Sequence, residues 1–352
     1  MFRRCLEISE HFLEGDFVED KYGIIFDVKG YEHPPGKVVA YPRYLPSKFG
    51  NRVRDGKRYE KIYDLKVRYG FLRNKLKEYL VYDEVFDDYI SEVPLNNIIK
   101  HYMPSEFLKK LLKSDKLSSL ERIALKLALI LAEESGINME SIGISGSLMV
   151  GLYKDDSDID IVIYGSAESR KAVNALKDLF QKGILRRHSV DEYRKLFEFR
   201  KAYKVMSFES FVKHEKRKIF QGFFEGREFF IRFVKRPYEL PRYGEFTYKN
   251  LGNVTAEVIV VDDSDSIFTP TKYKVKTLRI LETGSLKEKI SKNKVEEVVS
   301  FRGRFCQQVF TGELALVKGK LEKVYYKGTF SHYRIIIGGS TNDYFISKSF
   351  LR

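Results

Sequence analysis

Two pairs of residues, separated by a short gap, have the types and spacing needed to bind a metal ion and the phosphates of a nucleotide. Gly146 and Ser147 are adjacent, and ten residues separate them from Asp158 and Asp160. Alternating isoleucines around the aspartates predict a strand, on which Asp158 and Asp160 share one face with Cα atoms about 6.6 Å apart. Two such carboxylates repel each other unless a cation lies between them. Mg²⁺ (or Mn²⁺) accepts one or two carboxylates, with substrate phosphates completing its coordination.

The Gly146–Ser147 turn suits the phosphate end of a nucleotide. Glycine lets the backbone approach a ligand closely, and Ser147 begins a short predicted helix whose first amides are free to donate. The serine hydroxyl adds another donor. The turn and the strand together therefore predict a site for a nucleoside triphosphate and a metal ion.

The elements that must position these residues alternate between helices and strands. Ser118, three residues before Glu121, predicts the start of a helix that Gly136 ends. Strands are expected at 142–144 and 158–164, a helix at 166–183, and a hairpin that joins 221–224 to 229–234. Beyond residue 241 only strands are expected, ending in a hairpin of 333–337 and 344–347. This order predicts an α/β (α+β) core with a mixed sheet.

The pattern of Gly-Ser, a ten-residue gap and Asp-x-Asp resembles the DNA polymerase beta-like nucleotidyltransferase superfamily. The resemblance covers residues 118–236, and the extra modules on both sides are similar to those of predicted archaeal nucleotidyltransferases. It implies Mg²⁺-dependent transfer of a nucleotidyl group from an NTP to a hydroxyl acceptor. It also implies that Asp158 and Asp160 are the catalytic metal ligands and that Gly146 and Ser147 bind the triphosphate.

Active members of the superfamily usually carry a third carboxylate on a later strand. At the matching place this chain has Arg232, which we expect either to bind phosphate or to form an ion pair with one of the two aspartates. Glu228 lies on the same face of the predicted strand and is a candidate metal ligand, and Asp262 or Asp263 is a second candidate. If Arg232 neutralises the aspartates, the alternative function is a catalytically degenerate domain that binds nucleic acid.

The charge of the chain favours a nucleic-acid acceptor. Among 352 residues, 63 are Lys or Arg and 49 are Asp or Glu, which gives a net charge of +14 and points to a polyanionic partner. Residues 186–236 combine basic with aromatic residues, which suits RNA, tRNA or single-stranded DNA, although most of these rings are expected in the core. The basic stretch 43–77 is a second candidate for contact with nucleic acid. A third possible function, an antibiotic- or protein-modifying nucleotidyltransferase, would not explain the strong positive charge. The residues expected to contact nucleic acid are Arg186, Arg187, Lys216, Arg217 and Lys218.

Composition also excludes several classes of protein and predicts the domains. Cys5 and Cys306 are the only cysteines, which excludes a disulfide framework or a cysteine zinc site. No apolar run approaches the roughly 18 residues that span a bilayer, and no signal pattern begins the chain, so we expect a cytoplasmic protein without a membrane partner. Three domains are expected: an N-terminal β-rich or α+β module at 1–103, a nucleotidyltransferase-like domain at 104–240 and a C-terminal β-rich domain at 241–352.

Overall fold

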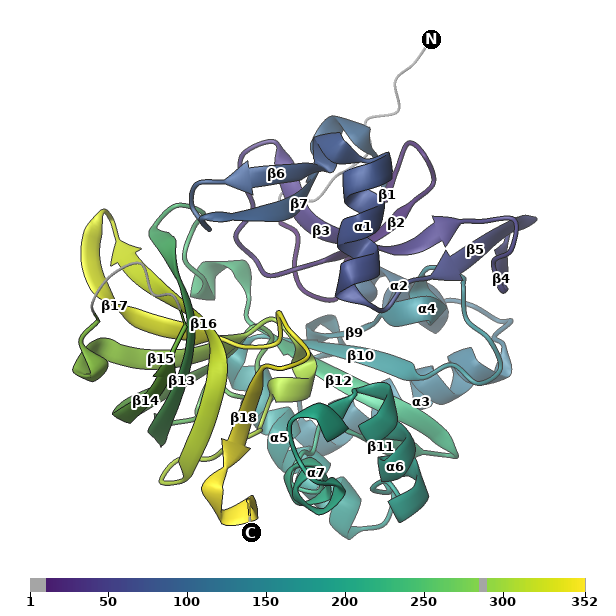
Figure 1. Ribbon diagram of the computed structural model, residues 1–352. Helices are drawn as coiled ribbons and strands as arrows, with labels where there is room; N and C mark the ends of the chain where they lie inside the picture. Colours follow the sequence, from purple (N-terminus) through teal and green to yellow (C-terminus); the bar gives the residue numbers. More distant parts are fainter. Residues whose placement is uncertain (1–10, 285–289, 352) are drawn as a thin grey trace. The chain divides into compact units, whose positions relative to one another are not determined.

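The computed structural model describes residues 11–284 and 290–351, which form a mixed α+β fold with seven α-helices and three β-sheets (Figure 1). The chain divides into two units, each discontinuous in sequence. Unit 1 comprises Met1–Tyr82, Tyr89–Arg186 and Phe220–Leu240, and unit 2 comprises Asp83–Asp88, Arg187–Ile219 and Pro241–Arg352. The segment 187–219, assigned from the sequence to the central domain, thus groups with the C-terminal residues. The predicted three-domain division stays a prediction.

An eight-stranded sheet forms the N-terminal part of unit 1. Its main strand order is β4-β5-β3-β2-β1-β8, and β7 pairs with both β3 and β6. Helix α1 (Leu65–Lys75) begins at Asp64, whose carboxylate accepts two amides of the first turn, and its buried Leu72 packs with Val18 and Phe26. The strands are β1 (Phe17–Asp20), β2 (Ile25–Val28), β3 (Lys37–Pro46), β4 (Arg52–Arg54), β5 (Lys57–Lys61), β6 (Leu80–Asp83), β7 (Asp88–Pro94) and β8 (Ile98–Tyr102).

A four-stranded mixed sheet with the order β11-β12-β10-β9 forms the rest of unit 1. The central strand β10 runs parallel to β12 and antiparallel to β9, and its isoleucines 159, 161 and 163 are fully buried. Helices α3 and α5 pack on β10, and α2 packs on β9. The elements are α2 (Pro104–Leu112), α3 (Ser119–Ser135), β9 (Ile142–Ile144), α4 (Gly146–Met149), β10 (Ile159–Tyr164), α5 (Ser166–Gln181), β11 (Gln221–Phe224) and β12 (Arg227–Val234).

The capping signals of the sequence are confirmed in α3. The Ser118 hydroxyl accepts the amide of Glu121, and the Glu121 carboxylate accepts the amide of Ser118. Gly136 ends the helix with a left-handed φ of 62°, a conformation that glycine adopts without steric cost. Helix α3, which packs on the mixed sheet, therefore has both of its ends determined by the local sequence.

Two short helices, α6 (Val190–Phe199) and α7 (Phe208–Glu215), belong to unit 2. Their apolar faces meet at Tyr193, Phe197 and Phe211, which are all buried. Many of the aromatic residues in the basic segment 186–236 are thus core residues, as expected.

The C-terminal strands of unit 2 form a closed ring. β13 pairs with β14, β14 with β15, β15 with β17, β17 with β16, and β16 again with β13. β18 pairs with β16 as well, at Ala315–Lys318, whereas β17 pairs with β16 at Lys320–Tyr326. The predicted final hairpin of 333–337 and 344–347 is therefore wrong, because both strands use different ends of the long β16. The strands are β13 (Phe246–Asp262), β14 (Thr271–Thr283), β15 (Val295–Ser300), β16 (Leu314–Tyr326), β17 (Thr329–Ile336) and β18 (Tyr344–Ser347).

None of the helices formed by residues 11–284 and 290–351 has the length and apolarity needed to cross a bilayer.

Candidate nucleotide and metal site

Asp158 and Asp160 lie together at the beginning of β10, in the central sheet of unit 1. Burial and the negative charge of Asp158 raise the pKa of Asp160 to about 7, because both effects disfavour a second negative charge. An arrangement of this kind attracts a cation, which would relieve the repulsion between the two carboxylates.

The Gly146–Ser147 turn lies directly against Asp160. Gly146 has a φ of +69°, and a Cβ atom at this position would lie 1.9 Å from the Oδ2 atom of Asp160. The Ser145 amide donates to the Asp160 carbonyl at 2.8 Å. The Oγ atom of Ser147 is buried and has no hydrogen-bond partner within the described residues. The structure thus brings together all four residues of the sequence motif.

The N-terminal sheet supplies cations that the motif did not reveal. The positive charges of Lys61 on β5 and Arg43 on β3 lower the pKa of Asp160, as does Arg232 on β12 of the central sheet, and all three act against burial and Asp158. Arg43 donates to the Ile62 carbonyl at 3.3 Å, and the Lys61 ammonium lies 4.8 Å from the centre of the Tyr63 ring. Within the described part of the chain, neither Arg43 nor Lys61 is paired with a carboxylate. The only signal in the sequence was the density of basic residues at 43–77.

A shared apolar cluster explains why the N-terminal sheet reaches this site. Tyr44 and Tyr59 from β3 and β5 pack with Met149, Val150 and Leu152, which lie two to five residues after Ser147. A guanidinium nitrogen of Arg54 also donates to the Val150 carbonyl at 3.2 Å. The N-terminal sheet and the motif are therefore parts of one packed core.

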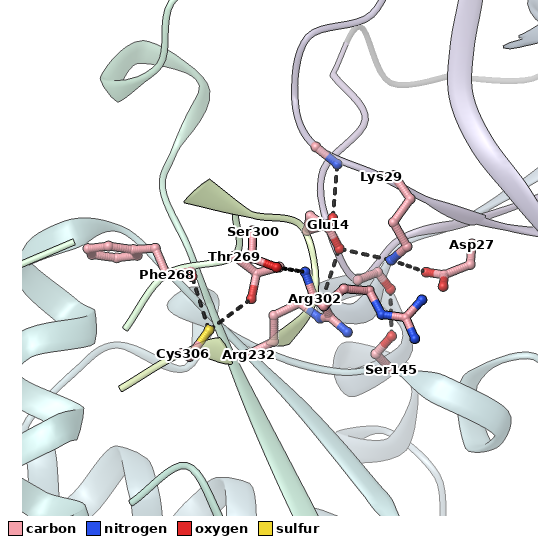
Figure 2. A network of polar contacts seen from close by, with 12 residues as sticks. Glu14, Asp27, Lys29, Ser145, Arg232, Phe268, Thr269, Ser300, Arg302 and Cys306 are labelled. Carbon is pink, nitrogen blue, oxygen red and sulfur yellow. Dashed lines mark hydrogen bonds and ion pairs between the residues drawn. The ribbon is translucent and has the colours of Figure 1, made fainter. Parts of the chain in front are cut away.

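Arg232 forms an ion pair with Glu14, a residue of the N-terminal segment, at 2.9 Å. Glu14 is almost completely buried and also pairs with Lys29 at 3.1 Å, which in turn pairs with Asp27 at 3.0 Å. Figure 2 shows Glu14 between Arg232 and Lys29. The Ser145 hydroxyl donates to the Gly15 carbonyl, next to Glu14 in the chain, at 2.5 Å. From the sequence, a phosphate or one of the two aspartates was the expected partner of Arg232. Glu14 was missed because nothing local marks it.

The predicted third carboxylate is not supported by the geometry. Glu228 lies near the beginning of β12 and is exposed. Asp262 and Asp263 belong to unit 2, where Asp262 pairs with Lys274 at 3.1 Å and Asp263 accepts a hydrogen bond from Thr311. Residues 11–284 and 290–351 contain no group of three His, Cys, Asp or Glu side chains able to hold a metal ion. The candidate metal ligands that the structure brings together are therefore the two aspartates.

Lys218, predicted to contact nucleic acid, is buried in unit 2. Its ammonium pairs with Glu215 at 2.6 Å and donates to the Arg304 carbonyl at 2.6 Å. Glu215 also pairs with Arg200 at 2.8 Å. Lys218 therefore offers no charge to a ligand at the surface, because its side chain is buried and paired with Glu215.

The other four predicted contacts differ in exposure. Arg186 and Lys216 are exposed, whereas Arg187 and Arg217 are half-buried. Arg217 pairs with Glu313 at 2.9 Å, and Arg187 donates to the Lys218 carbonyl at 3.0 Å. The structure thus does not bring the five predicted residues together as one exposed basic surface.

Comparison with known proteins agrees with the motif. Residues 125–222 match the family described as a nucleotidyltransferase domain. The uncharacterized protein MJ1086 of Methanocaldococcus jannaschii is 34% identical over 343 residues, which cover 92% of this chain and 94% of that protein. No solved structure matches the chain significantly. The chain therefore belongs to the same family as this archaeal protein and carries a nucleotidyltransferase domain in its centre.

Proposed function

We propose that the protein is a Mg²⁺-dependent nucleotidyltransferase of the polymerase beta-like superfamily, which moves a nucleotidyl group from an NTP to a hydroxyl of a nucleic-acid acceptor. The observation that carries this proposal is the pairing of Asp158 and Asp160 beside Gly146. The two carboxylates repel each other and would bind a cation. The glycine beside them has no side chain, which leaves room for a polyphosphate next to that cation.

The side chains present fit Mg²⁺ or Mn²⁺. Carboxylate oxygens are the ligands that these hard cations prefer, and the raised pKa of Asp160 reflects a negative charge that a cation would offset. When bound, the ion supplies a lowered pKa of the acceptor hydroxyl and neutralisation of charge on the attacking and leaving oxygens. Asp158 and Asp160 would hold it.

The residues around the aspartates have the chemistry to bind a triphosphate. The Ser147 hydroxyl has no partner within the described residues and would donate to a phosphate oxygen. Arg43 and Lys61 are half-buried cations close enough to Asp160 to change its pKa. We assign both to the phosphates, because lysine and arginine form strong charge-assisted hydrogen bonds with phosphate oxygens. Arg232, held by Glu14, adds positive charge to the same region.

The decisive experiment is to replace each aspartate by asparagine and to measure both Mg²⁺ binding and incorporation of labelled NTP into RNA. Asp158→Asn and Asp160→Asn should lower incorporation by at least about a hundredfold, because the metal supplies several kcal/mol of transition-state stabilisation. Asp156→Asn is the matched control, since Asp156 is an exposed carboxylate on the loop before β10. Near wild-type incorporation by both site variants would contradict the assignment.

The same assay addresses the degenerate alternative. A wild-type protein that binds nucleic acid but incorporates none of the four NTPs, with Mg²⁺ or Mn²⁺, would be a binding protein built on the nucleotidyltransferase fold. The ion pair between Arg232 and Glu14 favours the enzyme, because the Arg232 charge already has a carboxylate partner outside the aspartate pair.

A further inference from the structure

The closed ring of strands in unit 2 has a recognisable connectivity. If its strands β13 to β17 are numbered one to five, the order around the ring is 1-2-3-5-4-1, and strands three and five are parallel. This is the connectivity of the OB-fold, a five-stranded Greek-key barrel that binds oligonucleotides on strands two and three and on the loops between strands one and two and strands four and five. Connectivity alone does not establish function, which depends on the side chains that the barrel carries.

The hairpin of strands four and five, β16 and β17, carries exposed rings beside lysines. Tyr326 and Phe330 are 44% and 37% exposed, and Tyr325 pairs across the hairpin with Phe330. The Lys323 ammonium lies 5.7 Å and 5.2 Å from the ring centres of Tyr325 and Phe330. The Lys327 ammonium lies 5.2 Å from the ring of Tyr326. We call these five residues (323, 325, 326, 327 and 330) the hairpin patch.

We propose that the hairpin patch binds single-stranded nucleic acid. Exposed aromatic rings stack on unpaired bases of any sequence, and lysines between them contact the phosphates. A duplex fits less well, because its bases already stack on one another. A polyanion also matches the positive charge of the chain, which is +14. The hairpin therefore provides the two components of a single-strand binding site, rings and cations, at the loop that OB-fold barrels use.

This binding does not depend on catalysis, but the role of the bound strand as acceptor rests on the proposed function. In that role, unit 2 selects a single-stranded substrate, while the aspartates of unit 1 hold the metal ion for the transfer. The two functions are therefore separable by mutation.

The test is the binding of fluorescein-labelled single-stranded RNA and DNA of about twelve nucleotides, measured by fluorescence anisotropy without NTP or metal. Tyr326→Ala and Phe330→Ala should each weaken binding roughly tenfold, which corresponds to base stacking on one ring. Tyr326→Phe keeps the ring and should bind like wild type. Lys327→Gln should lower the slope of log affinity against log salt by about 0.7. Separate RNA and DNA titrations identify which strand binds more tightly.

The control is Tyr203→Ala, which removes a ring of similar exposure, 52%, from the basic segment 186–236. It should not weaken binding. Asp160→Asn should bind the oligonucleotide like wild type even though its incorporation of NTP is strongly reduced, which keeps failure of the binding site distinct from failure of the enzyme. Wild-type affinity in the Tyr326→Ala/Phe330→Ala double variant, a larger loss in Tyr203→Ala, or no binding at low salt would overturn the proposal.

Discussion

At the scale of single residues, the site depends on Gly146 having no side chain. Gly146 has no Cβ, and the space that a Cβ would fill belongs to the carboxylate of Asp160. We expect Gly146→Ala to push this carboxylate away and to weaken Mg²⁺ binding at least tenfold, as measured by calorimetry. Gly183→Ala is the matched control, because Gly183 has a similar φ of +71° but nothing within 4 Å of its Cβ position. Equal losses in both variants would mean that backbone strain alone is responsible.

A second prediction at this scale concerns Glu14, which we consider a positioning residue for Arg232. Glu14→Gln removes the charge that holds Arg232 at 2.9 Å, so the guanidinium becomes free to pair with the aspartates. Mg²⁺ binding should weaken, because a nearby cation competes with the metal. Combining Glu14→Gln with Arg232→Gln should restore it. If the double variant binds Mg²⁺ as poorly as Glu14→Gln, the effect is structural and the positioning role is wrong.

At the scale of elements, His214 links α7 to β18. Its Nδ1 atom lies 2.8 Å from the Ser210 carbonyl, which can only accept, and its Nε2 atom lies 3.1 Å from the Ser347 amide, which can only donate. These two contacts require the neutral imidazole with the proton on Nδ1. Burial lowers the pKa of His214 to about 4, so protonation breaks a contact between the two elements.

This pKa predicts acid sensitivity of unit 2. The folded pKa lies below the ordinary value of 6.5, so the unfolded chain binds the proton first and stability falls as the pH decreases from about 6.5 towards 4. Between pH 7 and pH 5 the loss due to His214 is about 2 kcal/mol. Urea unfolding of wild type and His214→Gln at both pH values measures it. The prediction fails if the difference between the two proteins does not change with pH.

Elements whose ends are marked by local sequence were predictable, and long-range contacts were not. The helix from Ser118 to Gly136 forms as predicted, and the strand predicted at 158–164 forms at Ile159–Tyr164, because capping and alternation act over a few residues. The pair of Arg232 and Glu14 joins residues 218 positions apart, and no periodicity connects them. The burial of Lys218 could not be predicted either, because nothing in the sequence distinguishes its partner Glu215 from an exposed acidic residue.

At the scale of the whole molecule, the net charge of +14 predicts that nucleic-acid binding weakens steeply with salt. The placement of individual lysines decides which substitutions change that slope. Lys218→Gln should leave the slope unchanged but destabilise unit 2 by about 3 kcal/mol, because it breaks a buried ion pair. Lys216→Gln is the control for stability, since Lys216 is exposed and its loss should not lower the melting temperature. Nucleic-acid binding that is insensitive to salt would contradict the prediction that the chain binds a polyanion.

The discontinuity of unit 2 also has a consequence for the order in which the protein is made. Residues 83–88 are held by strand β13, where the Tyr248 amide donates to the Val85 carbonyl and the Asn250 amide donates to Asp87, both at 2.8 Å. A ribosome adds about 5–20 residues per second. The turn at 83–88 is therefore synthesised roughly ten seconds or more before the β13 residues that bind it. The central sheet of unit 1 is complete once β12 has emerged. Unit 2 must instead wait for the last strand, so a nascent chain that stops after residue 240 leaves the turn at 83–88 without the strands that hold it.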